Sequence, residues 1–336
     1  MRGSTAARQV FAYARGAYLS IGVWLGLTDV PFIDIPSSPL VPGAQPVRIH
    51  YRDAGQGAPI VVLHGGWGYE AYPFDRQIAA LSAVHRVVIP DRSGYGRSPA
   101  IDDLPPDFHH RAAAETQSLI HALGLARPIL WGHSDGAIIA LLLGLASRAV
   151  AGVILEAAHL YKRKPASRRF FEAIVADPAS IGERAAAALA RDHGERWRQL
   201  VDLHSRAWLR IGDEAGSPDE DFYQGRLRAL DGPVLLVHGA RDPRTEPGEL
   251  EALCNALSAN RTPSTGGTVH RAFQMFPDRG HSPHSEPASA DAVTEAALKF
   301  VNAIGAADGA ADEQGAHPPD PACPAHPAPP ALKSHD

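Results

Sequence analysis

Residues 128–143 of the chain read PILWGHSDGAIIALLL, and this stretch decides the fold. The apolar run 129–131 is typical of a short buried strand, and the run that begins at Ala137 is typical of a helix. Between them, residues 132–136 follow the pattern glycine–any–serine–any–glycine. The small residues permit a sharp turn that lifts the serine onto the edge of a sheet. The pattern therefore predicts that Ser134 is a nucleophile at a strand–turn–helix junction.

The composition bounds the class of protein. The chain has 336 residues, which suffices for one large α/β domain with an insertion or for two domains. Its 45% hydrophobic and 21% charged residues are typical of a soluble globular protein, and a net charge of −5 gives no sign of a nucleic-acid-binding face. Two cysteines make a disulfide framework improbable, which fits a reducing compartment, so we expect a cytoplasmic monomer or homodimer.

Short strands alternate with helices along most of the chain. Apolar, β-branched runs occur at 60–63, 86–90, 152–155, 234–237 and 273–276, besides the one at 129–131. This alternation predicts an α/β fold with a mostly parallel central sheet that helices cover on both faces.

The strand pattern stops at 159–229, where charged and alanine-rich helical stretches predict a helical cap inserted in the α/β core. The expected organisation is then an N-terminal segment 1–45, a core of 46–158 and 230–304, the cap, and a disordered Pro/Ala-rich tail 305–336.

The N-terminal segment contains a mostly apolar run at 10–27 that Arg15 interrupts. Because a signal peptide needs an uninterrupted apolar core, we expect an amphipathic helix that packs on the protein or lies at its surface. Contact with a membrane surface is the alternative interpretation.

Polar loops follow the predicted strands, and three of them supply Ser134, Asp242 and His281 in that order. Ligands of open α/β sheets bind at the carboxyl ends of the strands, where these loops meet. A serine hydroxyl is a weak nucleophile at neutral pH, so it needs a nearby base, and a carboxylate orients that base. The three residue types in this order therefore indicate nucleophilic catalysis.

Over residues 46–304 the chain resembles the α/β-hydrolase fold superfamily, with the motifs GHSDGA, LEAAH and GHSPH similar to those of esterase-like members. The resemblance implies that Ser134 is the nucleophile, Asp242 the acid and His281 the base, without a cofactor. It also implies an oxyanion hole formed by the backbone N–H groups of Gly66 and Asp135. The expected reaction is hydrolysis of a carboxylic ester of a small-molecule substrate with a small to medium apolar acyl group. C–C bond, lactone or peptide hydrolysis on the same triad, or a non-catalytic ligand-binding role, are the alternatives.

Several residues near these motifs have competing interpretations. Glu156 ends the strand at 152–155, where some members of the superfamily carry the acid, so it stays a rival of Asp242; if unused, it would line the pocket or bind the cap. His284 is a rival of His281, and we expect it at the surface or behind the base. The side chain of Asp135 would lie near the pocket or cap the following helix.

Other side chains are expected to define the surroundings. Trp67 follows Gly66 and would form a wall of the acyl pocket. We expect the basic run 162–164 at a solvated edge of the cap, and no metal site, because the histidines lack the spacing of ligands. The aromatic residues of the cap would form mainly its own core, with a minority facing the substrate: Phe170, Phe171, Trp197 and Trp208.

Overall fold

A computed structural model describes residues 31–258 and 270–313, and only the backbone of 307–313. The predicted N-terminal helix and the tail beyond 313 lie outside these residues. The described part holds an eight-stranded sheet in the order β1-β2-β4-β3-β5-β6-β7-β8. The strands are β1 (Phe32–Ile35), β2 (Val47–Ala54), β3 (Pro59–Leu63), β4 (Arg86–Pro90), β5 (Ile129–His133), β6 (Gly152–Glu156), β7 (Val234–Gly239) and β8 (Arg271–Phe276). Only β1 and β2 are antiparallel to their neighbours.

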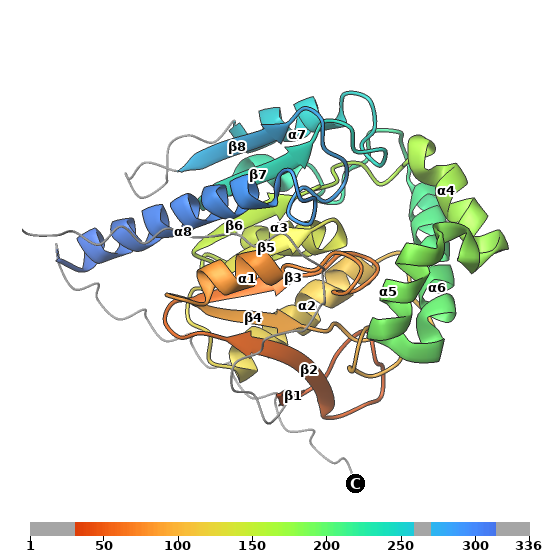
Figure 1. Cartoon of the computed structure of the whole chain (residues 1–336), viewed down its shortest axis with the longest axis horizontal. Coiled ribbons are helices and arrows are strands. Elements are labelled where there is room, and N and C mark those ends of the chain that lie inside the picture. The colour runs from red at the N-terminus through yellow and green to blue at the C-terminus, as the bar shows by residue number, and fades with distance from the viewer. Residues whose placement is uncertain (1–30, 259–269, 314–336) are drawn as a thin grey trace, which may run out of the picture. The chain divides into compact units, whose positions relative to one another are not determined.

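Helices cover both faces of this sheet, as predicted (Figure 1). The covering helices are α1 (Asp75–Leu81), α2 (Phe108–Ala122), α3 (Asp135–Ala146), α7 (Glu249–Ser258) and α8 (Ala290–Glu313). Successive side chains of a strand point to opposite faces. In β3, Val61 and Leu63 accordingly belong to the buried cluster that includes α2, α3 and α7, while Ile60 and Val62 belong to the cluster that includes α1 and α8. The sheet is therefore buried on both sides, which explains its continuous apolar runs.

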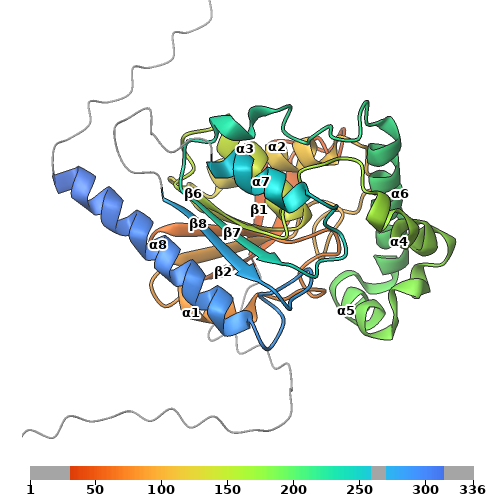
Figure 2. The same ribbon diagram turned by 90° about the horizontal axis from the view of Figure 1, so that it is seen from above.

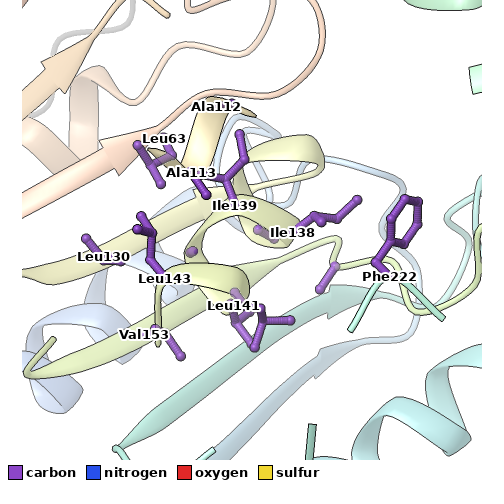
Figure 3. Close-up of a cluster of buried hydrophobic side chains, with 14 of the residues drawn as sticks. Leu63, Ala112, Ala113, Leu130, Ile138, Ile139, Leu141, Leu143, Val153 and Phe222 are labelled. Atoms are coloured by element: carbon purple, nitrogen blue, oxygen red, sulfur yellow. The ribbon is translucent and has the colours of Figure 1, made fainter. Parts of the chain in front are cut away.

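The larger core cluster lies between the sheet and α3. Figure 3 shows Leu63 and Leu130 of the sheet together with Ile139 and Leu143 of α3 in this cluster. All four side chains are almost completely excluded from solvent. Because α3 begins directly after Ser134, this packing also fixes the position of the serine.

The segment predicted as a cap forms three helices after β6: α4 (Pro165–Ala176), α5 (Glu183–His193) and α6 (Trp197–Glu214). Figure 2 shows them together beside one end of the sheet. They have a small cluster of their own, in which Leu189 and Trp197 pack with Trp67 from the loop after β3. No helix in the described ranges combines the length and the apolar character needed to cross a membrane.

Two element boundaries differ from the sequence predictions. The N-terminal segment contains β1, a four-residue edge strand that pairs only with β2 and is too short and too exposed to show as a strand in the sequence. The tail was predicted to be disordered from 305, but α8 continues to Glu313. The alanines of that region are strong helix formers, so the helix extends beyond its packed part.

Candidate active site

Ser134 occupies a strained turn between β5 and α3. Its φ and ψ angles are 55° and −119°, a conformation that costs an ordinary residue about 1–3 kcal/mol. The flanking glycines are required by space: a Cβ on Gly132 would lie 2.1 Å from the Gly136 carbonyl oxygen, and one on Gly136 would lie 2.0 Å from that of Leu63. The sequence pattern therefore arises from close backbone packing around the serine.

A histidine–carboxylate pair lies in the same site. The Nδ1 atom of His281 is 2.8 Å from Oδ2 of Asp242, and both side chains are buried. The other oxygen of Asp242 accepts a hydrogen bond of 2.9 Å from the backbone N–H of Arg244. Nε2 of His281 has no hydrogen-bond partner in the described part of the chain. His281 and Ser134 line one pocket, so the unpartnered nitrogen and the serine belong to the same site.

The environment sets the charge state of this pair. Burial lowers the pKa of His281, and the nearby cation of Arg244 lowers it further, against the opposing effect of Asp242. Burial acts to raise the pKa of Asp242, but its interactions with His281 and the Arg244 amide hold that pKa well below the usual value. At neutral pH the pair is thus a neutral imidazole beside an ionised carboxylate, which is the state a general base requires.

Glu156 takes part in a different pair. Its Oε1 atom accepts hydrogen bonds from the backbone N–H of His284 at 2.9 Å and from Nδ1 of the same residue at 2.8 Å. Both side chains are fully buried, and the His284 ring stacks on Phe74 at 3.8 Å. The expectation that Glu156 lines the pocket or binds the cap is therefore wrong. Of the two positions expected for His284, the structure shows the buried one, with its ring packed on His133 next to His281, and not the one at the surface. Alternation along β6 directs Glu156 to the same sheet face as Ile154, which packs with α1 and α8.

Gly66 and Asp135, the residues predicted to form an oxyanion hole, both lie near Ser134: Gly66 lines the same pocket and Asp135 follows the serine in the chain. Asp135 is the first residue of α3, so its N–H has no partner within the helix. Gly66 lines the pocket beside Trp67. A Cβ on Gly66 would lie 1.9 Å from Nε2 of His204 and 2.7 Å from Oδ2 of Asp135, so a larger residue there would displace this hydrogen-bonded pair.

The side chain of Asp135 does not cap α3, contrary to one of the expectations. Its Oδ2 atom lies 2.7 Å from Nε2 of His204, and its Oδ1 atom lies 3.1 Å from Nε2 of His109 and 3.2 Å from the indole nitrogen of Trp208. Burial opposes ionisation, yet His204 and His109 hold the pKa of this carboxyl well below its usual value. The carboxylate thus joins α2 and the cap helix α6 behind the nucleophile. Sequence reasoning missed His204, although its spacing of four residues from Trp208 places both on one helix face.

The cap supplies much of the pocket wall. The expectation that only a minority of its aromatic residues faces the pocket is wrong, because Phe170, Phe171 and Trp208 all line it, whereas Trp197 belongs to the cap's own cluster. The full lining comprises Gly66, Trp67, Tyr72, His133, Ser134, His159, Lys164, Ser167, Phe170, Phe171, His204, Trp208, Arg244 and His281.

The basic run 162–164 is only partly solvated. Lys164 is buried, and its ammonium group binds both carboxylate oxygens of Glu249. The expectation of a solvated edge is wrong for this residue because α4 folds back over the start of α7. Across the described ranges, no group of three or more histidine, cysteine, aspartate or glutamate side chains is arranged to hold a metal ion.

A mostly parallel α/β sheet with a serine at a strand–helix turn, and a histidine–carboxylate pair at the same edge, defines the class of α/β hydrolases. The model of the alpha/beta hydrolase family matches residues 60–296, and the chain belongs to this family.

Individual relatives cover different amounts of the chain. Serine hydrolase BPHL of Homo sapiens is 29% identical over 213 residues, which cover 59% of this chain and 68% of that protein. Epoxide hydrolase A of Mycobacterium tuberculosis is 36% identical over 95 residues, or 28% of this chain, and the match spans only 30% of that enzyme's length. Among solved structures, an esterase from Thermogutta terrifontis has a TM-score of 0.59 at 23% identity, covering 82% of this chain and 99% of that one. This last similarity confirms the predicted fold.

Proposed function

We propose that the protein is a serine hydrolase that cleaves a carboxylic ester of a small-molecule substrate through an acyl-enzyme. The observation that carries the proposal is the Asp242–His281 hydrogen bond of 2.8 Å in a pocket that Ser134 also lines, with Nε2 of His281 left unpartnered among the described residues. The match to a protein named a serine hydrolase supports the assignment of a serine nucleophile.

In the proposed reaction, Nε2 of His281 takes the proton of the Ser134 hydroxyl while the serine oxygen attacks the ester carbonyl. Asp242 keeps the Nδ1–H tautomer in place and stabilises the imidazolium that forms. The N–H groups of Gly66 and Asp135 would bind the developing oxyanion, and such donors contribute roughly 2.7–4 kcal/mol each to transition-state stabilisation in other enzymes. The tetrahedral intermediate collapses when His281 gives its proton to the leaving alcohol.

Hydrolysis of the acyl-enzyme repeats these steps with water. His281 removes a proton from a water molecule, the resulting hydroxide attacks the acyl carbonyl, and the proton returns to the oxygen of Ser134. The released products are a carboxylic acid and an alcohol, and the enzyme is regenerated.

The proposal is tested with p-nitrophenyl esters of short acids and with a fluorophosphonate probe. We expect turnover by the wild-type protein and covalent labelling at one residue, and we expect Ser134→Ala to abolish both because the nucleophile is removed. Ser282→Ala is a matched control, since this serine lies next to His281 but bonds to His133. Activity that persists in Ser134→Ala would refute the proposed role of the serine.

A further inference from the structure

The pocket wall is unevenly charged. No aspartate or glutamate occurs among the described residues that line it, whereas two cations, Lys164 and Arg244, do. The carboxylates closest to the nucleophile are already bound by histidines: Asp242 by His281 and Asp135 by His204. A substrate in this pocket therefore meets positive charge without a competing anion in the wall.

The positive charge of Lys164 is not available to a substrate. Its ammonium group binds both oxygens of Glu249, and both side chains are less than 5% exposed. A buried ion pair of this kind neutralises its own charge and is costly to break. Burial also lowers the pKa of the pocket residues His133 and His159, so these imidazoles are neutral at pH 7.

Arg244 is different, because its guanidinium group has no anionic partner in the described part of the chain. Its central carbon lies 5.2 Å from the centre of the Trp67 ring and 4.9 Å from that of Phe170. The two rings hold the cation by cation–π contact, which does not require the guanidinium N–H groups as hydrogen-bond donors to a carboxylate. The planar edge of a guanidinium group matches the two oxygens of a carboxylate.

A second unpartnered donor lies on the same wall. The hydroxyl of Ser167 is buried and has no hydrogen-bond partner among the described residues, although it lines the pocket. Ser167 is three residues before Phe170 on α4, so the two share a helix face, and Phe170 contacts Arg244. Buried hydroxyl groups are almost always hydrogen-bonded, so this one indicates a missing acceptor.

We propose that Arg244 and Ser167 form a subsite for a carboxylate on the acyl part of the substrate, so that the preferred substrates are half-esters of dicarboxylic acids. We place this carboxylate on the acyl part because Arg244 contacts Trp67, and Trp67 directly follows Gly66, the residue proposed to hold the ester carbonyl. This inference rests on the proposed hydrolase function and names the substrate class of the same site.

The first test compares two esters of equal acyl length, the mono-p-nitrophenyl ester of glutaric acid and p-nitrophenyl pentanoate. We expect the wild-type protein to prefer the anionic ester in kcat/KM. In Arg244→Gln the ratio of kcat/KM for the anionic ester to kcat/KM for the neutral ester should fall by about tenfold or more, because a charge-assisted hydrogen bond is lost. Ser167→Ala should lower the ratio by a smaller factor, and Arg244→Lys should retain part of it because the charge remains.

Arg241→Gln is the matched control, since this arginine lies on the same loop but is exposed and pairs with Asp278. We expect it to keep the wild-type ratio. A wild-type protein that cleaves both esters without preferring the anionic one, or a ratio unchanged in folded Arg244→Gln, overturns the inference.

A binding experiment separates this inference from the proposed function. In Ser134→Ala, which keeps the pocket, glutarate should raise the melting temperature, glutaramide should not, and the double variant Ser134→Ala/Arg244→Gln should lose the shift. If neither ester is cleaved by the wild-type protein but glutarate stabilises it through Arg244, the hydrolase proposal fails while the carboxylate subsite stands. If glutarate causes no Arg244-dependent shift, the subsite is refuted whatever the esterase result.

Discussion

Two acidic residues follow neighbouring parallel strands, yet the fold gives them different partners. Glu156 ends β6 and contacts His284, whereas Asp242 lies in the loop after β7 and contacts His281. Side-chain alternation along β6 aims Glu156 at the sheet face that α1 and α8 cover, while Asp242 lies in the loop after β7. The direction in which each side chain points, and not its chemical type, therefore decides which histidine each carboxylate contacts.

The first prediction compares substitutions of these two acids. Asp242→Asn should lower kcat by about four orders of magnitude, because an amide favours the wrong imidazole tautomer, as it does in serine proteases. Glu156→Gln keeps a carbonyl acceptor for His284, so its kcat should stay close to that of the wild type. Steady-state kinetics on a p-nitrophenyl ester measure both, and a larger loss in Glu156→Gln would transfer the role of the acid to Glu156.

The second prediction concerns pH. His281 must be neutral to act as a base, and burial together with Arg244 lowers its pKa from 6.5. Activity should therefore be full at pH 7 and be lost as the pH falls through a midpoint below 6.5. The profile of kcat/KM for a neutral ester measures that midpoint, and Arg244→Gln should move it upward because a neighbouring positive charge is removed. A midpoint above 7 would contradict this prediction.

At the scale of elements, the base of the cap is attached to the core through one buried carboxylate. Glu249, the first residue of α7, accepts hydrogen bonds from the backbone N–H groups of Leu160 at 2.7 Å and Tyr161 at 3.0 Å, and it binds the ammonium group of Lys164. These three donors belong to the segment that leads from β6 into α4. Glu249 thus determines where the cap begins.

The third prediction follows from this attachment. Lys164→Met leaves the carboxylate of Glu249 buried without its cation, so we expect the free energy of unfolding to fall by about 3–5 kcal/mol. Lys162→Met is the control, because Lys162 pairs with Glu220 at the surface, where such pairs contribute at most about 1 kcal/mol. Urea denaturation compares the two variants. Equal decreases in the free energy of unfolding of the two variants would show that the buried pair stabilises the protein no more than the surface pair does.

On the scale of the whole molecule, α5 and the start of α6 share a small apolar cluster, whereas Phe171 of α4 and Trp208 of α6 belong to the larger cluster that also contains sheet residues. Leu189 of α5 is fully buried in the small cluster, and Leu130 of β5 is fully buried in the larger cluster. Clusters that share few residues can open separately, so we expect α5 and the start of α6 to differ from the sheet in local stability.

The fourth prediction tests this division. Leu189→Ala should destabilise by about 2–5 kcal/mol, as buried leucine truncations do, and should speed amide hydrogen exchange in α5 and the start of α6 while the β5 amides keep their protection. Leu130→Ala, which makes the same truncation in the larger cluster, should speed exchange in the sheet. If Leu189→Ala speeds exchange equally in β5, the cap and the core unfold as one unit.

The sequence by itself determined the fold class, and it predicted the order in which the serine, the acid and the histidine of the candidate site occur in the chain. Short apolar strands alternating with helices specify a parallel sheet covered on both faces, and the glycines around Ser134 specify a turn too tight for larger residues. These features are local in the chain, so periodicity and residue size reveal them. The edge strand β1 escaped prediction because four residues paired on one side leave too weak a pattern.

Only the tertiary structure decided which polar groups meet. It paired Glu156 with His284, buried Lys164 against Glu249, joined Asp135 of α3 to His204 of the cap, and left Arg244 without a carboxylate partner among the described residues. Each contact links residues far apart in sequence, and all but the Glu156–His284 pair depend on how the cap packs on the core. The pattern of the chain therefore predicts a serine at a strand–helix turn, whereas the folded cap determines the charge of the pocket that Ser134 lines.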